Sequence, residues 1–101
     1  MSHGVKIFDV GDAVRCRAEF RDLAGTLIDP TTVSVSVKAP DGQITTKVYN
    51  TDPEVVRESA GKFYIDVDAT ASGVWHYRFF STGTGKAAAE RQFNVRRSNF
   101  A

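Results

Sequence analysis

The stretch from Ser59 to Phe80 constrains the fold of this chain most, because it holds two runs of strict two-residue alternation separated by small residues. The inward apolar positions are Phe63, Ile65 and Val67 in the first run, and Trp75, Tyr77 and Phe79 in the second. Successive side chains of a β-strand point to opposite faces, so each run predicts a strand with one buried face. Ser72-Gly73 supplies turn residues between them. We therefore expect a hairpin with Trp75 at the centre of the core.

A second hairpin is expected over residues 33–49. Val33, Val35 and Val37 alternate with small polar residues, Pro40-Asp41-Gly42 is a strong turn signal, and Ile44–Tyr49 returns as the partner strand. The valine strand would favour aggregation as a bare edge, so we expect it to be paired or covered, within the chain or by a neighbouring subunit.

The remaining strands are shorter or less regular. Val5–Phe8 is expected to form a short first strand, and Ala13–Phe20 alternates well. Lys86–Val95 also alternates except at Arg91, where a bulge or a snorkelling side chain is expected. Asn50–Glu58 is polar and lacks a period, so we interpret it as a crossing between layers, and Ser81–Gly85 as a loop tip. This pattern predicts an all-β fold, an immunoglobulin-like antiparallel sandwich of about seven strands, with a small barrel as the alternative.

The bulk composition agrees with one domain over residues 1–101, with a core from about 5 to 95 and a C-terminal tail over 96–101. The apolar share is 42% of 101 residues, which is typical of a globular chain. Cys16 is the single cysteine, so no disulfide is expected, and its place on an apolar strand face predicts a small buried hydrophobe.

Charge and hydropathy limit the partners. The formal net charge is +1, which gives no electrostatic reason to expect nucleic acid or an anionic membrane. No apolar run approaches the roughly 20 residues of a membrane helix, and the N-terminal residues lack the apolar centre of a secretory signal. We expect the chain to be made and folded in a cytoplasm.

No constellation of residues predicts catalysis, a cofactor or a metal site. His3 lies near the N-terminus, His76 lies opposite Trp75 on its strand, and no serine or threonine has an identifiable base. The pairs Asp66/Asp68 and Asp9/Asp12 lack the oxygen count that calcium needs. The chain is therefore expected not to be an enzyme.

Some charged and aromatic residues lack an obvious interior place. Arg15, Arg17 and Arg21 form a basic row that a solvated face or acidic neighbours would explain. Arginine and phenylalanine are favoured at interface hot spots, so side chains left outside the core are candidates for partner contact. These candidates are Phe80, Arg96, Arg97 and Phe100.

Five segments together resemble small immunoglobulin-like virion structural proteins of tailed bacteriophages and prophages, over roughly residues 7 to 95. They are Phe8–Asp12, Asp29–Val33, Pro40–Gly42, Gly73–Phe79 and Ser81–Gly85. The resemblance implies a structural protein of the virion, made in the host cytoplasm, and it carries no catalytic residues.

Three functions follow as hypotheses. The leading one is a capsid decoration protein that binds the major capsid protein on the head surface and forms a homo-oligomer on the particle. The first alternative is a tail or head–tail connector component. The second is a carbohydrate-binding or adhesion module, which the placement of nearly all aromatic rings in predicted strands disfavours.

Overall fold

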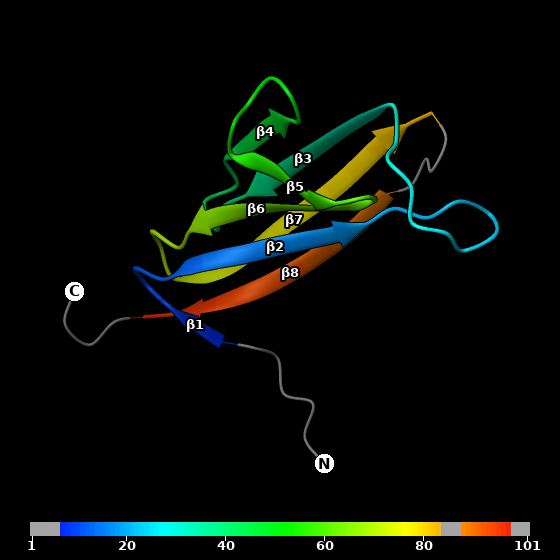
Figure 1. The fold of residues 1–101 in the computed structure, drawn as a ribbon. Coiled ribbons are helices and arrows are strands. Elements are labelled where there is room, and N and C mark those ends of the chain that lie inside the picture. Colours follow the sequence, from blue (N-terminus) through cyan, green and yellow to red (C-terminus); the bar gives the residue numbers. More distant parts are fainter. Residues whose placement is uncertain (1–6, 84–87, 98–101) are drawn as a thin grey trace, which may run out of the picture.

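The computed structural model describes residues 7–83 and 88–97 as eight strands in two packed sheets (Figure 1). The five-stranded sheet has the order β1-β8-β7-β3-β4, and the three-stranded sheet has the order β2-β6-β5. Neighbours are antiparallel except β1 and β8, which are parallel. The strands are β1 Ile7–Asp9, β2 Ala13–Glu19, β3 Thr32–Lys38, β4 Ile44–Val48, β5 Val55–Ser59, β6 Lys62–Asp68, β7 Gly73–Thr82 and β8 Ala88–Arg96. The predicted two-sheet sandwich is confirmed, with eight strands in place of about seven.

The predicted hairpin within residues 59–80 is wrong, because its two strands belong to different sheets. β6 pairs with β2 and β5, whereas β7 pairs with β3 and β8. The connection between them passes over the end of the sandwich, where Ala69 is fully buried. Turn residues mark a reversal of the chain but not the partner of the next strand, and two apolar faces are also buried when they oppose each other across a core.

The central place of Trp75 is confirmed. Its side chain is 6% exposed, and its ring stacks on Phe93 with centroids 5.9 Å apart. The indole Nε1–H donates to the carbonyl of Ala71 at 3.0 Å, which satisfies its one polar group inside the core. Phe79 on the same strand is fully buried.

The interpretation of residues 50–58 as a crossing is only partly right. Residues 49–54 cross between the sheets, but Val55–Ser59 forms β5. The β5–β6 register shifts between Arg57 and Ser59, and this irregularity breaks the alternation that would have revealed a strand. Asn50 has a φ of 73° in the turn, a conformation that asparagine tolerates better than most residues.

Other sequence predictions are confirmed. Val14, Cys16, Ala18 and Phe20 are buried, and so are Val33, Val35 and Val37. β3 forms its hairpin with β4 and lies between β4 and β7, so the valine strand is paired within its own chain. Arg91 is exposed in an unbroken register opposite Tyr77 and donates to the carbonyl of Glu90, so the snorkelling explanation is correct and the bulge is absent.

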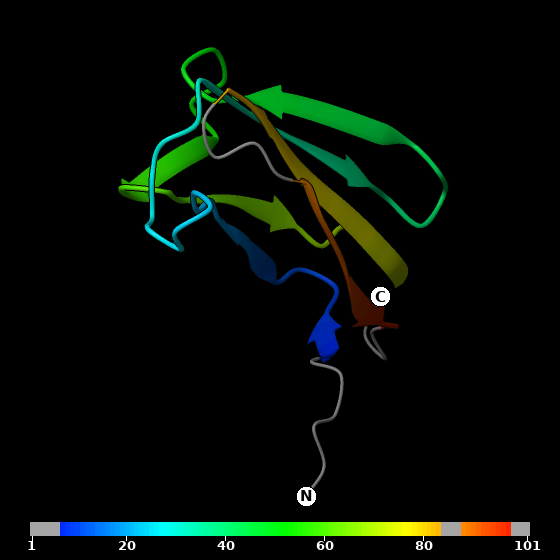
Figure 2. The same cartoon turned by 90° about the vertical axis from the view of Figure 1, so that its right-hand side faces the viewer.

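The loop between β2 and β3 ties the β5–β6 turn to the rest of the molecule. Phe20 N–H donates to the carbonyl of Gly61 at 2.8 Å, and Gly61 N–H donates to the Asp29 carboxylate at 2.9 Å. The same carboxylate accepts from Arg57 at 3.0 Å. The β3–β4 hairpin lacks such ties and extends to the right beyond the three-stranded sheet in Figure 2.

Candidate functional site

The outer face of the five-stranded sheet brings together side chains from four strands. Residues directly opposite each other in paired strands share a face, so the registers define rows across the sheet. Two neighbouring rows are Thr46–Ser36–Arg78–Glu90 and Ile44–Lys38–His76–Gln92. These residues are distant in sequence and become neighbours only through the strand order.

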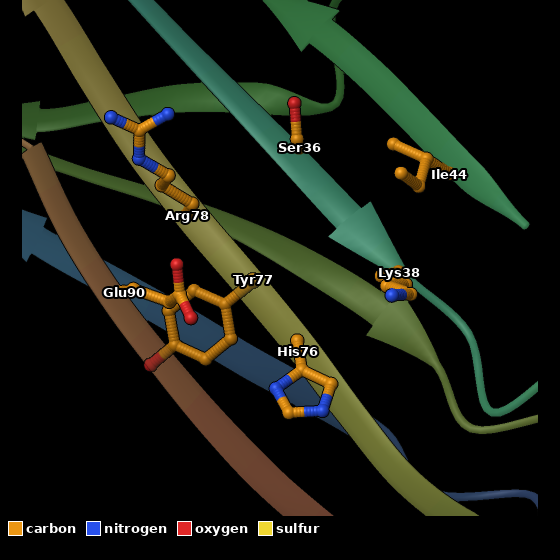
Figure 3. Close-up of a pocket in the computed structure, with 7 residues that line it drawn as sticks. All are labelled: Ser36, Lys38, Ile44, His76, Tyr77, Arg78 and Glu90. Atoms are coloured by element: carbon orange, nitrogen blue, oxygen red, sulfur yellow. The ribbon is translucent and has the colours of Figure 1, made fainter. Parts of the chain in front are cut away.

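A shallow hollow of about 320 Å³ lies over these rows (Figure 3). Lys38, His76, Arg78 and Glu90 line it with Ile44 at one side, and they are spread over several strands rather than converging on one point. Within the described part of the chain, Lys38, Arg78 and Glu90 form no ion pair. The Arg78 guanidinium instead lies 5.6 Å from the Phe80 ring centroid. The charges on this face are therefore available to an external partner.

Apolar side chains surround the hollow on the same outer face. Ile44, the first residue of the second row, is 61% exposed, and Val74, two residues before His76 on β7, is 41% exposed. Ile7 of β1 is 60% exposed beside Asn94 of β8. Phe80 is half-buried on the same face at the far end of β7. Protein-binding surfaces typically combine apolar and arginine side chains with a polar rim, and this face has that composition.

The outer face of the three-stranded sheet is different, because most of the charged side chains of β2 and β6 are paired there, with Arg17 and Asp68 as the exceptions among the described residues. Arg15 donates to both oxygens of Asp66 at 2.8 and 3.0 Å, and its guanidinium lies 3.9 Å from the Tyr64 ring centroid. The hydrogen bond from Arg15 lowers the pKa of the Asp66 carboxyl below its usual value. Glu19 pairs with Arg21 at 2.9 Å and with Lys62 at 3.9 Å. The expectation that acidic neighbours would explain the basic row is correct for Arg15 and Arg21.

The four residues predicted to contact a partner do not form one cluster. Phe80 pairs with Ala88 at one end of β8, and Arg96 lies eight residues further along that strand, roughly 26 Å away at the usual rise. Arg96 is bonded to Asp9 and lowers the pKa of that carboxyl. Arg97 is exposed, and Phe100 lies outside the described residues. Phe80 and Arg96 therefore lie at opposite ends of the five-stranded sheet, Arg96 as the last residue of β8, and Arg97 follows just beyond that end.

Cys16 has the burial that its sequence position predicts. It is fully buried, and burial raises the pKa of its thiol to about 12. Because the thiolate is the reactive form, this cysteine is unsuited to act as a nucleophile or metal ligand at neutral pH.

Three of the four carboxylates that were weighed as calcium ligands have protein partners. Asp66 is held by Arg15, Asp9 by Arg96, and the Asp12 carboxylate accepts from the backbone N–H of Asp9 at 2.8 Å. Across residues 7–83 and 88–97 there is no group of three or more histidine, cysteine, aspartate or glutamate side chains that could hold a metal ion. His3 lies outside this part of the chain. No helix in the described ranges is long and apolar enough to cross a membrane.

The hollow over the five-stranded sheet was missed at the level of sequence. The alternation in each strand correctly placed Lys38, His76 and Arg78 outward, but it contained no information on which strands are neighbours. A cluster formed across β3, β7 and β8 has no signal in the spacing along any one of them.

These features define an immunoglobulin-like β-sandwich domain, and comparison with known proteins supports this class. The filamin domain of Lin-41 in its crystal structure matches with a TM-score of 0.69 at 16% identity, over 96% of this chain and 89% of that chain. The IG1 domain of ZIG-8 in its homodimer matches with a TM-score of 0.47 at 13% identity, over 97% and 84%. No family model and no curated protein matches the sequence. The structural likeness to the filamin domain shows the fold alone.

Proposed function

We propose that this chain is a non-catalytic protein-binding domain that serves as a capsid decoration protein of a tailed bacteriophage. The phage setting rests on the sequence resemblance described above. The observation that supports binding is the outer face of the five-stranded sheet, where Lys38, Arg78 and Glu90 have no ion pair with any described residue and exposed Ile44 and Val74 share the face.

The shape of this face suits a protein partner better than a small molecule. The hollow is shallow and its side chains are spread across the sheet, whereas small-molecule sites enclose most of their ligand. A flat, two-layered domain can lie on a shell with one sheet facing the shell and the other facing solvent. The charge-paired face of the three-stranded sheet fits the solvent side.

Repetition on a symmetric particle would strengthen a contact of this size. Each copy presents one modest face, and many copies bound to neighbouring sites gain from effective concentration, most of all if they are linked to each other. The proposed partner is the major capsid protein, with acidic side chains opposite Lys38 and Arg78.

The absence of catalysis is part of the proposal. Cys16 is buried with a raised thiol pKa, and His76 lies in a row with Lys38 and Gln92 rather than beside a carboxylate that would orient it. The described residues place no nucleophile next to a base.

The test is quantitative mass spectrometry of purified virions, combined with a density map of the particle. A decoration protein is expected at the copy number of the major capsid protein or at a fixed fraction of it, with its five-stranded sheet toward the shell. A copy number near that of a tail ring would instead support the tail or connector alternative. Absence from washed virions would overturn the virion assignment.

A further inference from the structure

The β4 strand is an open edge of the five-stranded sheet. Among the residues that the structure describes, β4 pairs with β3 on one side and with no strand on the other. Edge strands present backbone N–H and C=O groups that can pair with another chain, and proteins usually protect them. β4 runs from Ile44 to Val48 with a regular register and without proline.

The hydrogen bonds at both ends of β4 identify which of its backbone groups point outward. Ala39 N–H donates to the carbonyl of Gln43, and Tyr49 N–H donates to the carbonyl of Val33. The backbone N–H and C=O groups of the odd-numbered residues of β4 therefore point toward β3. Backbone groups alternate in direction along a strand, so Ile44, Thr46 and Val48 face away from β3. Val48 is already satisfied, because its N–H donates to the Asp52 carboxylate and its carbonyl accepts from Asp52 N–H. The N–H and C=O groups of Ile44 and Thr46 remain open.

The other three sheet edges are better protected than β4. β1 is three residues long. β2 carries the exposed charges Arg15, Arg17 and Glu19, and the register of β5 is broken between Arg57 and Ser59. Short length, charge and bulges are the usual devices against pairing at an edge.

Asp52 covers the outward side of β4 at Val48, so the edge is accessible over the exposed residues Ile44, Thr45 and Thr46. A groove of about 340 Å³ lies between its inner side and β6, with Thr45 and Lys47 on one wall and Val67 on the other. Lys47 carries the one charge on the strand, and its Nζ lies 3.2 Å from Glu54 Oε2, toward the other sheet. The added strand would therefore meet neither the second layer nor an unpaired charge.

We propose that β4 pairs antiparallel with β4 of a second copy of this chain, about a two-fold axis that passes between the two Thr45 residues. In this register, Ile44 of each copy exchanges N–H···O=C bonds with Thr46 of the other, and every open backbone group is satisfied. Shifting the register to place Ile44 opposite Ile44 leaves Thr46 without a partner. Placing Thr46 opposite Thr46 brings Ile44 against Val48, whose groups are already occupied.

The edge is thus self-complementary, which is the requirement for an isologous dimer. The pairing joins two five-stranded sheets into one sheet of twice the width, continuous with the outer face that carries Arg78 and Ile44. The proposed occupant is a second copy, because the same two open residues in each copy satisfy all the open groups and the occupied Val48 is left outside the pairing.

The register is tested by cysteine cross-linking. Thr45 and its two-fold mate form a non-hydrogen-bonded pair, with Cα atoms roughly 4.5 Å apart and therefore within disulfide range. In Thr45→Cys, mild oxidation is expected to give a covalent dimer. The matched control is Thr46→Cys, one residue along the same exposed strand, whose Cα atoms would be about 8 to 9 Å apart across the interface and beyond disulfide range. We expect about tenfold more cross-linked dimer from Thr45→Cys, and the native Cys16 is buried and does not compete.

Sedimentation tests the same β4 pairing without a disulfide. Thr46→Pro removes an outward N–H without breaking a bond to β3, which an edge strand tolerates. Thr46→Ala loses the same 2.8 Å hydroxyl contact with Ser36 but keeps the N–H. In sedimentation runs up to millimolar concentration, wild type and Thr46→Ala should self-associate while Thr46→Pro stays monomeric.

Three results would each overturn the β4 pairing. They are equal cross-linking at positions 45 and 46, no cross-linking at either position, and self-association of Thr46→Pro like that of wild type. Binding of an extended peptide at β4 by a chain that stays monomeric would also overturn it. None of these results bears on the virion copy number, so the dimer and the decoration role can fail separately.

Discussion

The two sheets of this domain have similar interiors but different exteriors. Inside, both bury alternating aliphatic and aromatic side chains, such as Ile65 from one and Phe79 from the other. Outside, the three-stranded sheet pairs its charges, as Arg15 does with Asp66, whereas Lys38 and Arg78 on the five-stranded sheet are unpaired among the described residues. Most charges on the three-stranded sheet are thus paired within the chain, whereas Lys38 and Arg78 on the five-stranded sheet are available to a binding partner.

The hairpins at the ends of the two sheets show the same difference. The β5–β6 turn is bound to the β2–β3 loop through Gly61, while the β3–β4 turn at Gly42 meets open space. A segment tied by several hydrogen bonds stabilises the fold but has few groups left for recognition. The β3–β4 turn contributes less to stability than the β5–β6 turn, and it leaves the β4 edge and Ile44 accessible.

The largest expected effect is a loss of stability on replacing the glycine of a hairpin turn, and the loss differs between Gly61 and Gly42. Gly61 has a φ of 72°, and an added Cβ would lie 2.7 Å from the carbonyl oxygen of Phe20 and 2.9 Å from the nitrogen of Ile28. Gly42 has a φ of 93° but nothing within 4 Å. Gly61→Ala is expected to lower the free energy of unfolding by about 3 kcal/mol, and Gly42→Ala by about 1 kcal/mol, because only the first adds a backbone clash to the strain. Urea unfolding measures both, and equal losses would contradict the contrast between the turns.

A charge reversal on each outer face tests which of the two sheets contacts the phage particle. Arg78 and Arg17 are both exposed strand arginines without an ion pair among the described residues, on the five-stranded and three-stranded sheet respectively. Arg78→Glu is expected to weaken binding to particles that lack the protein by about tenfold, equivalent to 1.4 kcal/mol, while Arg17→Glu changes it less than about twofold. Co-sedimentation with such particles measures this. If Arg17→Glu is the damaging change, the faces have been assigned the wrong way round.

The smallest expected effect is on how stability changes at acidic pH. Arg15 lowers the folded-state pKa of Asp66, so this pair contributes stability above the unfolded-state pKa of about 3.9 and loses it as pH falls through the folded-state value. The pair is nearly half exposed, so its contribution is expected to be below about 1 kcal/mol. Asp66→Asn should lower the urea midpoint slightly at pH values near 6 and make it less sensitive to acidification to about 3. An unchanged acid profile in Asp66→Asn would show that the pair contributes nothing.

Much of the fold could be predicted from the alternation of side chains. The burial of Val35, Cys16 and Trp75 follows from the two-residue period, because a strand that buries one face must bury every second residue. The β3–β4 hairpin also follows, since its turn residues and its two strands are adjacent in sequence. Where a register irregularity interrupted the period, at Arg57–Ser59, the strand went unrecognised.

The candidate site could not be predicted in the same way. Phe80, Arg96, Arg97 and Phe100 were selected because each lacked an obvious interior place, and the structure separates Phe80 from Arg96 along the length of β8. The row that joins Ser36, Arg78 and Glu90 crosses three strands that are distant in sequence. Outward orientation is a property of one strand, whereas neighbourhood is a property of the sheet.

The sequence by itself determined that this chain is an all-β sandwich with Trp75 inside and a lone cysteine that is buried, because side-chain alternation is a local property that burial enforces residue by residue. Only the tertiary structure decided that β6 and β7 belong to different sheets, that Arg15 and Asp66 pair on one outer face, and that β4 is an edge strand. Those outcomes depend on which strands become neighbours, and this choice is made by the packing of the whole core.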